Sequence, residues 1–170
     1  MLETTRLQLV PLTHELLLLY KSNPQQLAKA LSINYIERQN DPAVAKDLEE
    51  AIEFWMSSTL ATPEKFEWVT NWEIILKGEK IAIGGIGFAG FPDDEGKTMV
   101  GYGLDIRYHN RGYATEALQA ILQWGFSHNQ LKKVISETPL PNIGSQNVLL
   151  KNGFYETYRD DQLIHWQIDK

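Results

Sequence analysis

The segment from Arg107 to Ala117 is the part of this sequence best suited to bind an anion. It joins an alternating apolar stretch to a stretch with helical spacing, so a strand should end and a helix begin there. The first turn of a helix has unpaired N–H groups and a positive dipole end, and both favour phosphate. Gly112 would let the backbone approach a ligand closely, while Arg107 and Arg111 would add positive charge. The segment therefore predicts a phosphate-binding loop; the alternative is an ordinary strand-to-helix loop with one glycine.

Periodicity and capping residues predict the elements that position this loop. Thr13 is an expected N-cap of a helix that ends before Pro24, Pro42 is expected early in a second helix, and Gly153 is a natural C-cap. Residues 25–40 are expected to form a short helix and a loop. Expected strands cover residues 6–10, 67–76, 81–91, 98–107, 134–138, 155–159 and 163–168, and the later helices cover 113–128 and 143–152.

This order of elements predicts an α+β fold. An antiparallel hairpin group leads into a β-α-β crossover, which gives a mixed, mostly antiparallel sheet of six to seven strands with about four flanking helices. The apolar parity of one strand changes across Gly84-Gly85, which is typical of a β-bulge. We expect residues 1–170 to form a single domain.

Composition excludes several classes of function. The sequence has 170 residues, no cysteine and a formal net charge of −6. The missing cysteines exclude disulfides, thiolate nucleophiles and zinc–sulfur sites, and we expect no metal site. The acidic balance argues against nucleic-acid binding. The leucine run at 16–19 is too short to cross a bilayer and no signal-peptide pattern is present, so we expect a cytoplasmic protein without a membrane partner.

Two blocks together resemble the GNAT acetyltransferases. His109-Asn110-Arg111-Gly112-Tyr113-Ala114 resembles that family's Arg/Gln-x-x-Gly-x-Gly/Ala motif for coenzyme A, with His109 and Asn110 as departures. Asn tolerates the left-handed backbone that such a loop needs. The segment from Asn142 to Phe154 is similar to a second family block and follows the first at the expected distance. Thr4-Thr5-Arg6-Leu7 and Gly101-Tyr102 resemble the branch that acetylates the N-termini of ribosomal proteins.

The resemblance implies where acetyl-CoA binds. Two neighbouring strands of the GNAT fold splay apart and bind the pantetheine arm like an added strand. Asn142 would contact that arm from the opposite lip, and His109 would lie beside the phosphates. The resemblance places Leu104, Asp105 and Ile106 along the pantetheine arm, and the N–H groups of Arg111, Gly112, Tyr113, Ala114 and Thr115 at the pyrophosphate.

The resemblance also implies which residues take part in the transfer. The Tyr that many members place near the sulfur is replaced here by Leu149, and Ser145 matches the substitute proposed in the ribosomal-protein branch. The alternative for Ser145 is a hydroxyl bonded to its own helix backbone. A general base must accept the amine's proton, and we favour Glu73 over Asp105 for that role. Either carboxylate could instead be a surface group.

The aromatic residues and the remaining histidines are less informative. Trp68, Trp72 and Tyr102 could shape an acceptor pocket, although alternating aromatics are more often core. His14, His128 and His165 have no partner spacing, and we expect them to be structural or exposed. The resemblance as a whole implies an acetyl-CoA-dependent N-acetyltransferase that acts on a protein N-terminus or a small amine. The alternative function is a non-catalytic acyl-CoA-binding module. Because many relatives are dimers, the resemblance also implies a possible homodimer.

Overall fold

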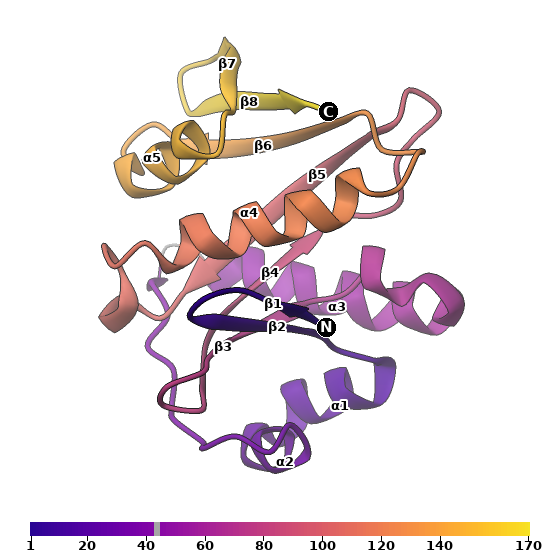
Figure 1. Ribbon diagram of the computed structural model, residues 1–170, viewed down its shortest axis with the longest axis vertical. Coiled ribbons are helices and arrows are strands. Elements are labelled where there is room, and N and C mark those ends of the chain that lie inside the picture. The colour runs from indigo at the N-terminus through magenta and orange to yellow at the C-terminus, as the bar shows by residue number, and fades with distance from the viewer. Residues whose placement is uncertain (43–44) are drawn as a thin grey trace.

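The protein is built on one continuous eight-stranded sheet, with the strand order β1-β2-β3-β4-β5-β6-β8-β7 (Figure 1). The computed structural model describes residues 1–42 and 45–170. All neighbouring strands pair antiparallel except β5 and β6, which are parallel. The strands are β1 (Leu2–Glu3), β2 (Leu7–Pro11), β3 (Trp72–Leu76), β4 (Ile81–Phe88), β5 (Lys97–Leu104), β6 (Lys133–Pro139), β7 (Tyr155–Arg159) and β8 (Leu163–Asp169).

Helices cover both faces of this sheet. Helix α4 crosses in front of the strands in Figure 1, while α3 lies behind them. The apolar side of α4, which includes Leu118 and Ile121, packs into the main core, and α1, α2 and α3 enclose a second core around Leu12, Leu17 and Leu27. The α-helices of the described residues are α1 (His14–Ser22), α2 (Pro24–Ala30), α3 (Ala45–Ala61), α4 (Tyr113–Phe126) and α5 (Ile143–Lys151).

The predicted fold class is confirmed, with differences in the number of elements. The sheet has eight strands because the two-residue strand β1 pairs with β2 at its edge. Thr13 caps α1 as predicted, accepting a hydrogen bond from the Leu16 amide at 3.4 Å. Pro24 follows the end of α1 and opens the short helix α2. Pro42, expected in the next helix, precedes residues 43–44, which lie outside the described part of the chain.

The predicted bulge is present in β4. Ile74 pairs with Gly84, whereas Ile75 pairs with Ala82, so Ile83 is the additional residue on the bulged strand. Gly84 is required here because a Cβ at this position would collide with the Gly103 carbonyl oxygen of β5. The bulge therefore lets β4 lie close to the strand that leads into the candidate phosphate loop.

Three predicted strand limits were wrong. The strand expected from residue 67 begins at Trp72, because residues Pro63–Trp68 form a 3-10 helix, η2, that Pro63 opens. The packing of Trp68 explains why this segment is not a strand. Its ring is buried against those of Phe88 and Trp124, with centroids 5.1 and 4.7 Å away. The strand expected over 81–91 ends at Phe88.

The third wrong limit is the end of the strand that leads into the candidate phosphate loop. The strand expected over 98–107 ends at Leu104, because Asp105 caps a 3-10 turn, η3 (Ile106–Tyr108), by accepting a hydrogen bond from the Arg107 amide. Asp105 and Ile106 therefore belong to a turn and not to the strand. Among the described residues, no helix is both long and apolar enough to cross a membrane.

Candidate active site

Strands β5 and β6 part from each other beside the start of α4. Their parallel pairing joins Lys97–Met99 to Lys133–Ile135 only. One residue further on, the Ser136 hydroxyl donates to the Val100 carbonyl at 3.1 Å. Beyond that contact the two strands follow separate courses, and the N-terminal ends of α4 and α5 lie at the same end of the molecule (Figure 1). The splayed pair that the sequence resemblance implied is thus present in the fold.

The connection from β5 to α4 has the backbone of an anion-binding loop. Asn110 and Gly112 both adopt left-handed conformations, with φ of +59° and +79°. Gly112 is the N-cap of α4 and supplies no side-chain hydrogen bond, whereas Thr13, Asn23 and Asn142 cap α1, α2 and α5 with side-chain oxygens. The first N–H groups of α4 therefore remain available to a ligand.

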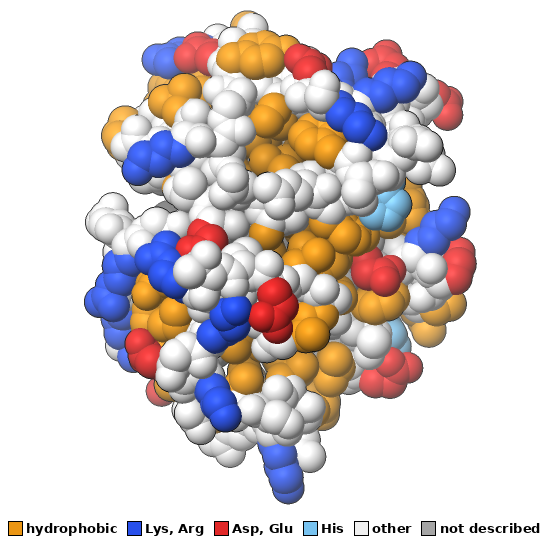
Figure 2. Space-filling model, viewed as in Figure 1, with side chains coloured by type: hydrophobic (Ala, Val, Ile, Leu, Met, Phe, Trp, Pro, Cys, Tyr) orange, Lys and Arg blue, Asp and Glu red, His pale blue; other side chains and the backbone are white. Residues whose placement is uncertain are grey.

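Positive charge surrounds this loop. Figure 2 shows basic side chains gathered at the left edge of the molecule, where Figure 1 places the connection between β5 and α4. Arg107 and Arg111 belong to this connection, and both are exposed. Tyr113, Ala114 and Thr115, which follow in the first turn, are half-buried. The five positions that the resemblance assigns to the pyrophosphate thus lie on one loop and one helical turn.

The backbone groups just before the loop are already bonded inside the protein. The Leu104 carbonyl lies 3.0 Å from His109 Nε2, the Asp105 amide donates to the Ile83 carbonyl, and the Ile106 amide donates to the Gln39 carbonyl. These three bonds leave little backbone capacity for the pantetheine arm at residues 104–106. The Ile106 side chain is 46% exposed, so this stretch can still offer apolar contact.

The Asp105 carboxylate points into the protein, where it anchors the loop that leads to α4. It is fully buried and accepts hydrogen bonds from the Gln39 amide at 2.9 Å and from Arg107 Nη2 at 2.6 Å. The Arg107 side chain, together with backbone donors, lowers the pKa of Asp105 to about 2. A carboxylate so strongly held as an anion is a poor acceptor of a proton at neutral pH.

Ser145 is bonded to Asn142 and to Tyr102. The Ser145 amide donates to Asn142 Oδ1 at 3.1 Å, and the Ser145 hydroxyl lies 2.9 Å from the Tyr102 hydroxyl. The Tyr102 hydroxyl also donates to the Ser145 carbonyl at 3.1 Å. Burial raises the pKa of Tyr102 to about 12, so this phenol stays protonated at neutral pH. The contact joins β5 to α5 across the parted strands.

Glu73 is a buried carboxylate that is held in an ion pair with the partly buried Arg38. Its carboxylate is 1% exposed, lies 2.7 Å from Arg38 Nη1 and accepts a hydrogen bond from Asn71 Nδ2 at 2.9 Å. Burial raises the pKa of Glu73, although the Arg38 guanidinium and the Asn71 amide act in the opposite direction. The Arg38 guanidinium also lies over the Tyr20 ring, 5.1 Å from its centroid.

Tyr102 and Glu73 point to opposite faces of the sheet. Tyr102 shares a cross-strand row with Trp72 and Ile86, whereas Glu73 shares the next row with Gly85 and Gly103. Glu73 lies two strands from β5, so its Cα is about 10 Å from that of Gly103. A Cβ on Gly103 would meet open space, which makes the Glu73 face of β5 accessible.

The other aromatic and histidine residues serve the core or the surface. Trp68 and Trp72 are buried against Trp124. Both residues therefore pack in the core and do not line an acceptor pocket. The His128 ring lies against the same cluster. His14 bonds the Thr59 hydroxyl, and His165 lies between Glu137 and Asp160.

Sequence reasoning missed three contacts of this site, which join Glu73 to Asn71, Glu73 to Arg38, and Tyr102 to Ser145. Asn71 and Glu73 are two residues apart, and that strand periodicity could have suggested a shared face. Arg38 lies in a stretch without periodicity, so no sequence signal indicated its pairing with Glu73. The contact between Tyr102 and Ser145 joins residues 43 positions apart and depends on the tertiary fold.

Comparison with known proteins decides the family. A family model described as an acetyltransferase (GNAT) domain matches residues 6–155. The chain belongs to the GNAT acetyltransferase family. This membership identifies an N-acetyltransferase that takes its acetyl group from acetyl-CoA. An uncharacterized N-acetyltransferase of Bacillus subtilis (strain 168), YjdG, is 28% identical over 166 residues, covering 98% of this chain and 96% of that protein.

Solved GNAT structures share the fold of this chain. A ribosomal-protein alanine acetyltransferase from Vibrio fischeri superposes with a TM-score of 0.65 and 18% identity, over 98% of this chain and 94% of that one. The ribosomal-protein α-N-acetyltransferase RimL, solved in complex with coenzyme A, gives a TM-score of 0.66 and 16% identity, over 98% of this chain and 95% of RimL. At these identities the likeness concerns the fold alone.

Proposed function

We propose that residues 1–170 form a single GNAT domain that moves the acetyl group of acetyl-CoA directly to a primary amine. The acceptor is a protein N-terminus or a small amine, and the absence of cysteine fits work in the reducing cytoplasm. The observation that carries the proposal is the start of α4: a helix with no side-chain cap and with left-handed Gly112 before it, beside two parted strands. That combination suits a phosphate-bearing ligand that continues into the sheet.

The binding residues follow from this placement. The N–H groups of the first turn would hold the pyrophosphate, with Arg111 at the rim. Asn142 and the side chains of Leu104 and Ile106 would line the pantetheine arm, while Asp105 acts through its anchoring of the loop. The pyrophosphate set is Arg111, Gly112, Tyr113, Ala114 and Thr115. When bound, acetyl-CoA supplies an activated acetyl thioester.

Ser145 is the proposed hydrogen-bond donor to the sulfur. A serine hydroxyl is a weak acid, but its contact with Tyr102 can assist it. The single phenol proton, which can bond the Ser145 carbonyl, can turn instead to Ser145 Oγ while Ser145 donates onward. Tyr102 thus compensates for the absence of a tyrosine at the position of Leu149. The pair supports the departing thiolate without needing an ionised side chain.

Glu73 is the proposed general base. Its raised pKa brings proton uptake closer to neutral pH, where a base is most effective. Gly103 leaves the sheet on this face without a side chain and is exposed, while the Asn71 side chain covers Gly85. Because Glu73 lies two strands from β5, proton transfer from the amine to its carboxylate would run through a connecting water, which is an accepted geometry for a general base.

A thiol-release assay tests this function. Purified protein is incubated with acetyl-CoA and a panel of amines that contains N-terminal peptides, polyamines and aminoglycosides. We expect acetyl-CoA to raise the melting temperature and one class of acceptor to release thiol. A melting temperature that acetyl-CoA leaves unchanged would contradict the cofactor assignment. Binding of acetyl-CoA without turnover on any acceptor would favour the non-catalytic binding module.

A further inference from the structure

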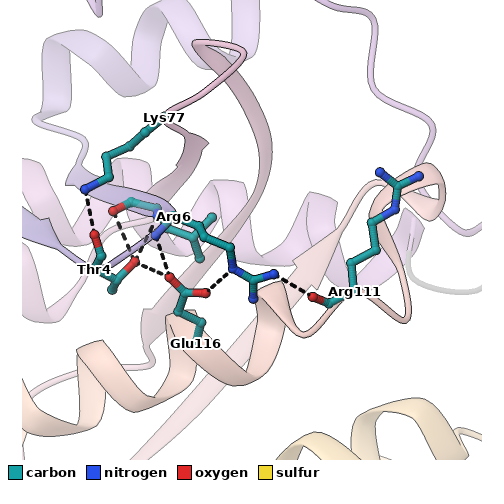
Figure 3. Close-up of polar contacts among 6 residues, drawn as sticks. Thr4, Arg6, Lys77, Arg111 and Glu116 are labelled. Atoms are coloured by element: carbon teal, nitrogen blue, oxygen red, sulfur yellow. Dashed lines mark hydrogen bonds and ion pairs between the residues drawn. The ribbon is translucent and has the colours of Figure 1, made fainter.

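Arg6 bridges the proposed phosphate loop from outside. It lies between β1 and β2, and its guanidinium reaches across to the first turn of α4 (Figure 3). Nη1 donates to the Arg111 carbonyl at 3.0 Å, while Nε donates to Glu116 Oε2 at 2.7 Å. One side chain therefore ties the last residue before Gly112 to the first turn of the helix after it.

The same guanidinium covers the middle of the loop. A Cβ built on Gly112 would lie 3.3 Å from Arg6 Nη2, so the guanidinium lies directly beside the glycine. Its central carbon lies 4.4 Å from the centroid of the Tyr113 ring. Arg6 thus contacts or borders Arg111, Gly112 and Tyr113, which are the positions proposed to present N–H groups to the pyrophosphate.

Glu116 is the fixed end of this bridge. Besides Arg6 Nε, its carboxylate accepts hydrogen bonds from the Thr4 hydroxyl at 2.6 Å and from the Arg6 amide at 2.8 Å. The Thr4 carbonyl is held in turn by Lys77 Nζ at 2.6 Å. Partial burial opposes ionisation of Glu116, but the bonds from Thr4 and Arg6 outweigh it and lower the pKa of Glu116.

An ionised Glu116 creates an electrostatic problem for an anion site. Negative charge in the first turn stabilises a helix, yet it repels a phosphate bound to the same N–H groups. Arg6 places its positive charge 2.7 Å from that carboxylate. We propose that Arg6 is a positioning residue for acetyl-CoA, which holds residues 111–113 in their anion-binding conformation and cancels the charge of Glu116 beside the pyrophosphate. This inference rests on the proposed function.

Two acetyl donors separate this role from a general structural one. Acetyl-CoA carries the pyrophosphate, whereas acetyl-pantetheine carries the same thioester without it. We expect Arg6→Gln to raise KM for acetyl-CoA about 10-fold and to leave KM for acetyl-pantetheine and both kcat values within about twofold. Arg6→Lys keeps the charge but cannot bond both partners, and we expect a smaller rise of about threefold.

A charge-neutral double variant tests the electrostatic part. In Arg6→Gln/Glu116→Gln the uncompensated carboxylate is gone, so KM for acetyl-CoA should fall back toward the wild-type value relative to Arg6→Gln alone. The matched control is Arg159→Gln, which breaks an exposed pair with Glu156 of the same 2.7 Å length on β7 and should change neither KM. Arg6→Lys serves in place of Arg6→Gln if the latter does not fold.

Two results would overturn the inference. The first is an unchanged KM for acetyl-CoA in both Arg6 variants, and the second is an equal rise of KM for both donors. Either result would leave the proposed function intact if wild-type protein still turns over acetyl-CoA. Failure of the wild type to bind or use acetyl-CoA would instead contradict the proposed function itself.

Discussion

The hydroxyl oxygen of Tyr102 lies 2.9 Å from the hydroxyl oxygen of Ser145. Tyr102 belongs to β5 and Ser145 to α5, so the contact spans the two sides of the parted strands. Because the Tyr102 pKa is raised to about 12, the phenol remains a hydrogen-bond donor throughout the physiological pH range. Ser145 therefore has a neutral phenol beside it, whose one proton can be donated to Ser145 Oγ or to the Ser145 carbonyl. A serine exposed on a helix would lack this donor.

Tyr102→Phe removes this donor without removing the ring. We expect kcat to fall about 10-fold while KM for acetyl-CoA stays within about twofold, since the lost bond supports the leaving thiolate and not the pyrophosphate. Steady-state kinetics measure both values. Tyr158→Phe is the matched control, because Tyr158 is 62% exposed on β7, and it should behave as wild type.

Ser145→Ala should lower kcat by a similar factor, and the double variant should be little worse than either single one. Residues that act as one unit show such non-additive losses. Additive losses in Tyr102→Phe/Ser145→Ala would mean that the two hydroxyls act separately. An unchanged kcat in Ser145→Ala would remove Ser145 from the mechanism.

The pair of Glu73 and Arg38 yields a second prediction, which separates stability from catalysis. Glu73→Gln leaves the Arg38 side chain, which is only 19% exposed, without its counterion, and we expect a loss of about 3 kcal/mol of unfolding free energy. Glu73→Leu combined with Arg38→Met removes both charges and should recover most of that stability. Urea denaturation measures the two differences.

Activity of the stable double variant then tests the proposed base. We expect kcat to fall about 100-fold at neutral pH, because no carboxylate remains to accept the amine's proton. The loss should diminish as the pH rises and more of the acceptor amine is already neutral. Wild-type turnover in a folded double variant would show that Glu73 and Arg38 serve the fold only.

Asp105 links acid stability to the phosphate loop. Its pKa is lowered to about 2, chiefly by the Arg107 side chain, so its ionised form stabilises the folded state above pH about 4. We expect Asp105→Asn to lower the unfolding free energy by about 2 kcal/mol at pH 7, with the difference falling to about half at pH 3. Urea titrations across that range measure it. Asp94→Asn, which changes an exposed carboxylate before β5, is the control and should leave the unfolding free energy at pH 7 unchanged.

The sequence predicted the parts of this fold that depend on local periodicity. Three features were predicted from the sequence: helix α4, the cap at Thr13 and the bulge beside Gly84. Each depends on neighbouring residues or on a glycine at a position too crowded for a side chain. The end of strand β5 at Leu104 could not be predicted from the sequence. There the apolar alternation continues through Ile106, and only the buried side chain of Asp105 ends the strand.

The sequence predicted the loop of the candidate site but not the side-chain pairs that support the site. Gly112 and the following helix carry a local pattern, and Asn110 adopts the left-handed conformation that its residue type tolerates. Arg6 and Glu116 are 110 positions apart, so no spacing rule could bring them together. The same holds for Arg38 and Glu73, whose pairing depends on how a loop without periodicity crosses the sheet.

The most direct test of the account is the affinity for acetyl-CoA in wild type and in Gly112→Glu, measured by isothermal titration calorimetry. Glutamate at this position would strain a backbone with φ of +79° and place a bulky negative charge at the pyrophosphate. We predict measurable binding to wild-type protein and none to a folded Gly112→Glu variant, with Gly78→Glu, on the exposed β3–β4 turn, binding as wild type. Equal affinity in all three proteins would place the cofactor elsewhere and contradict the account.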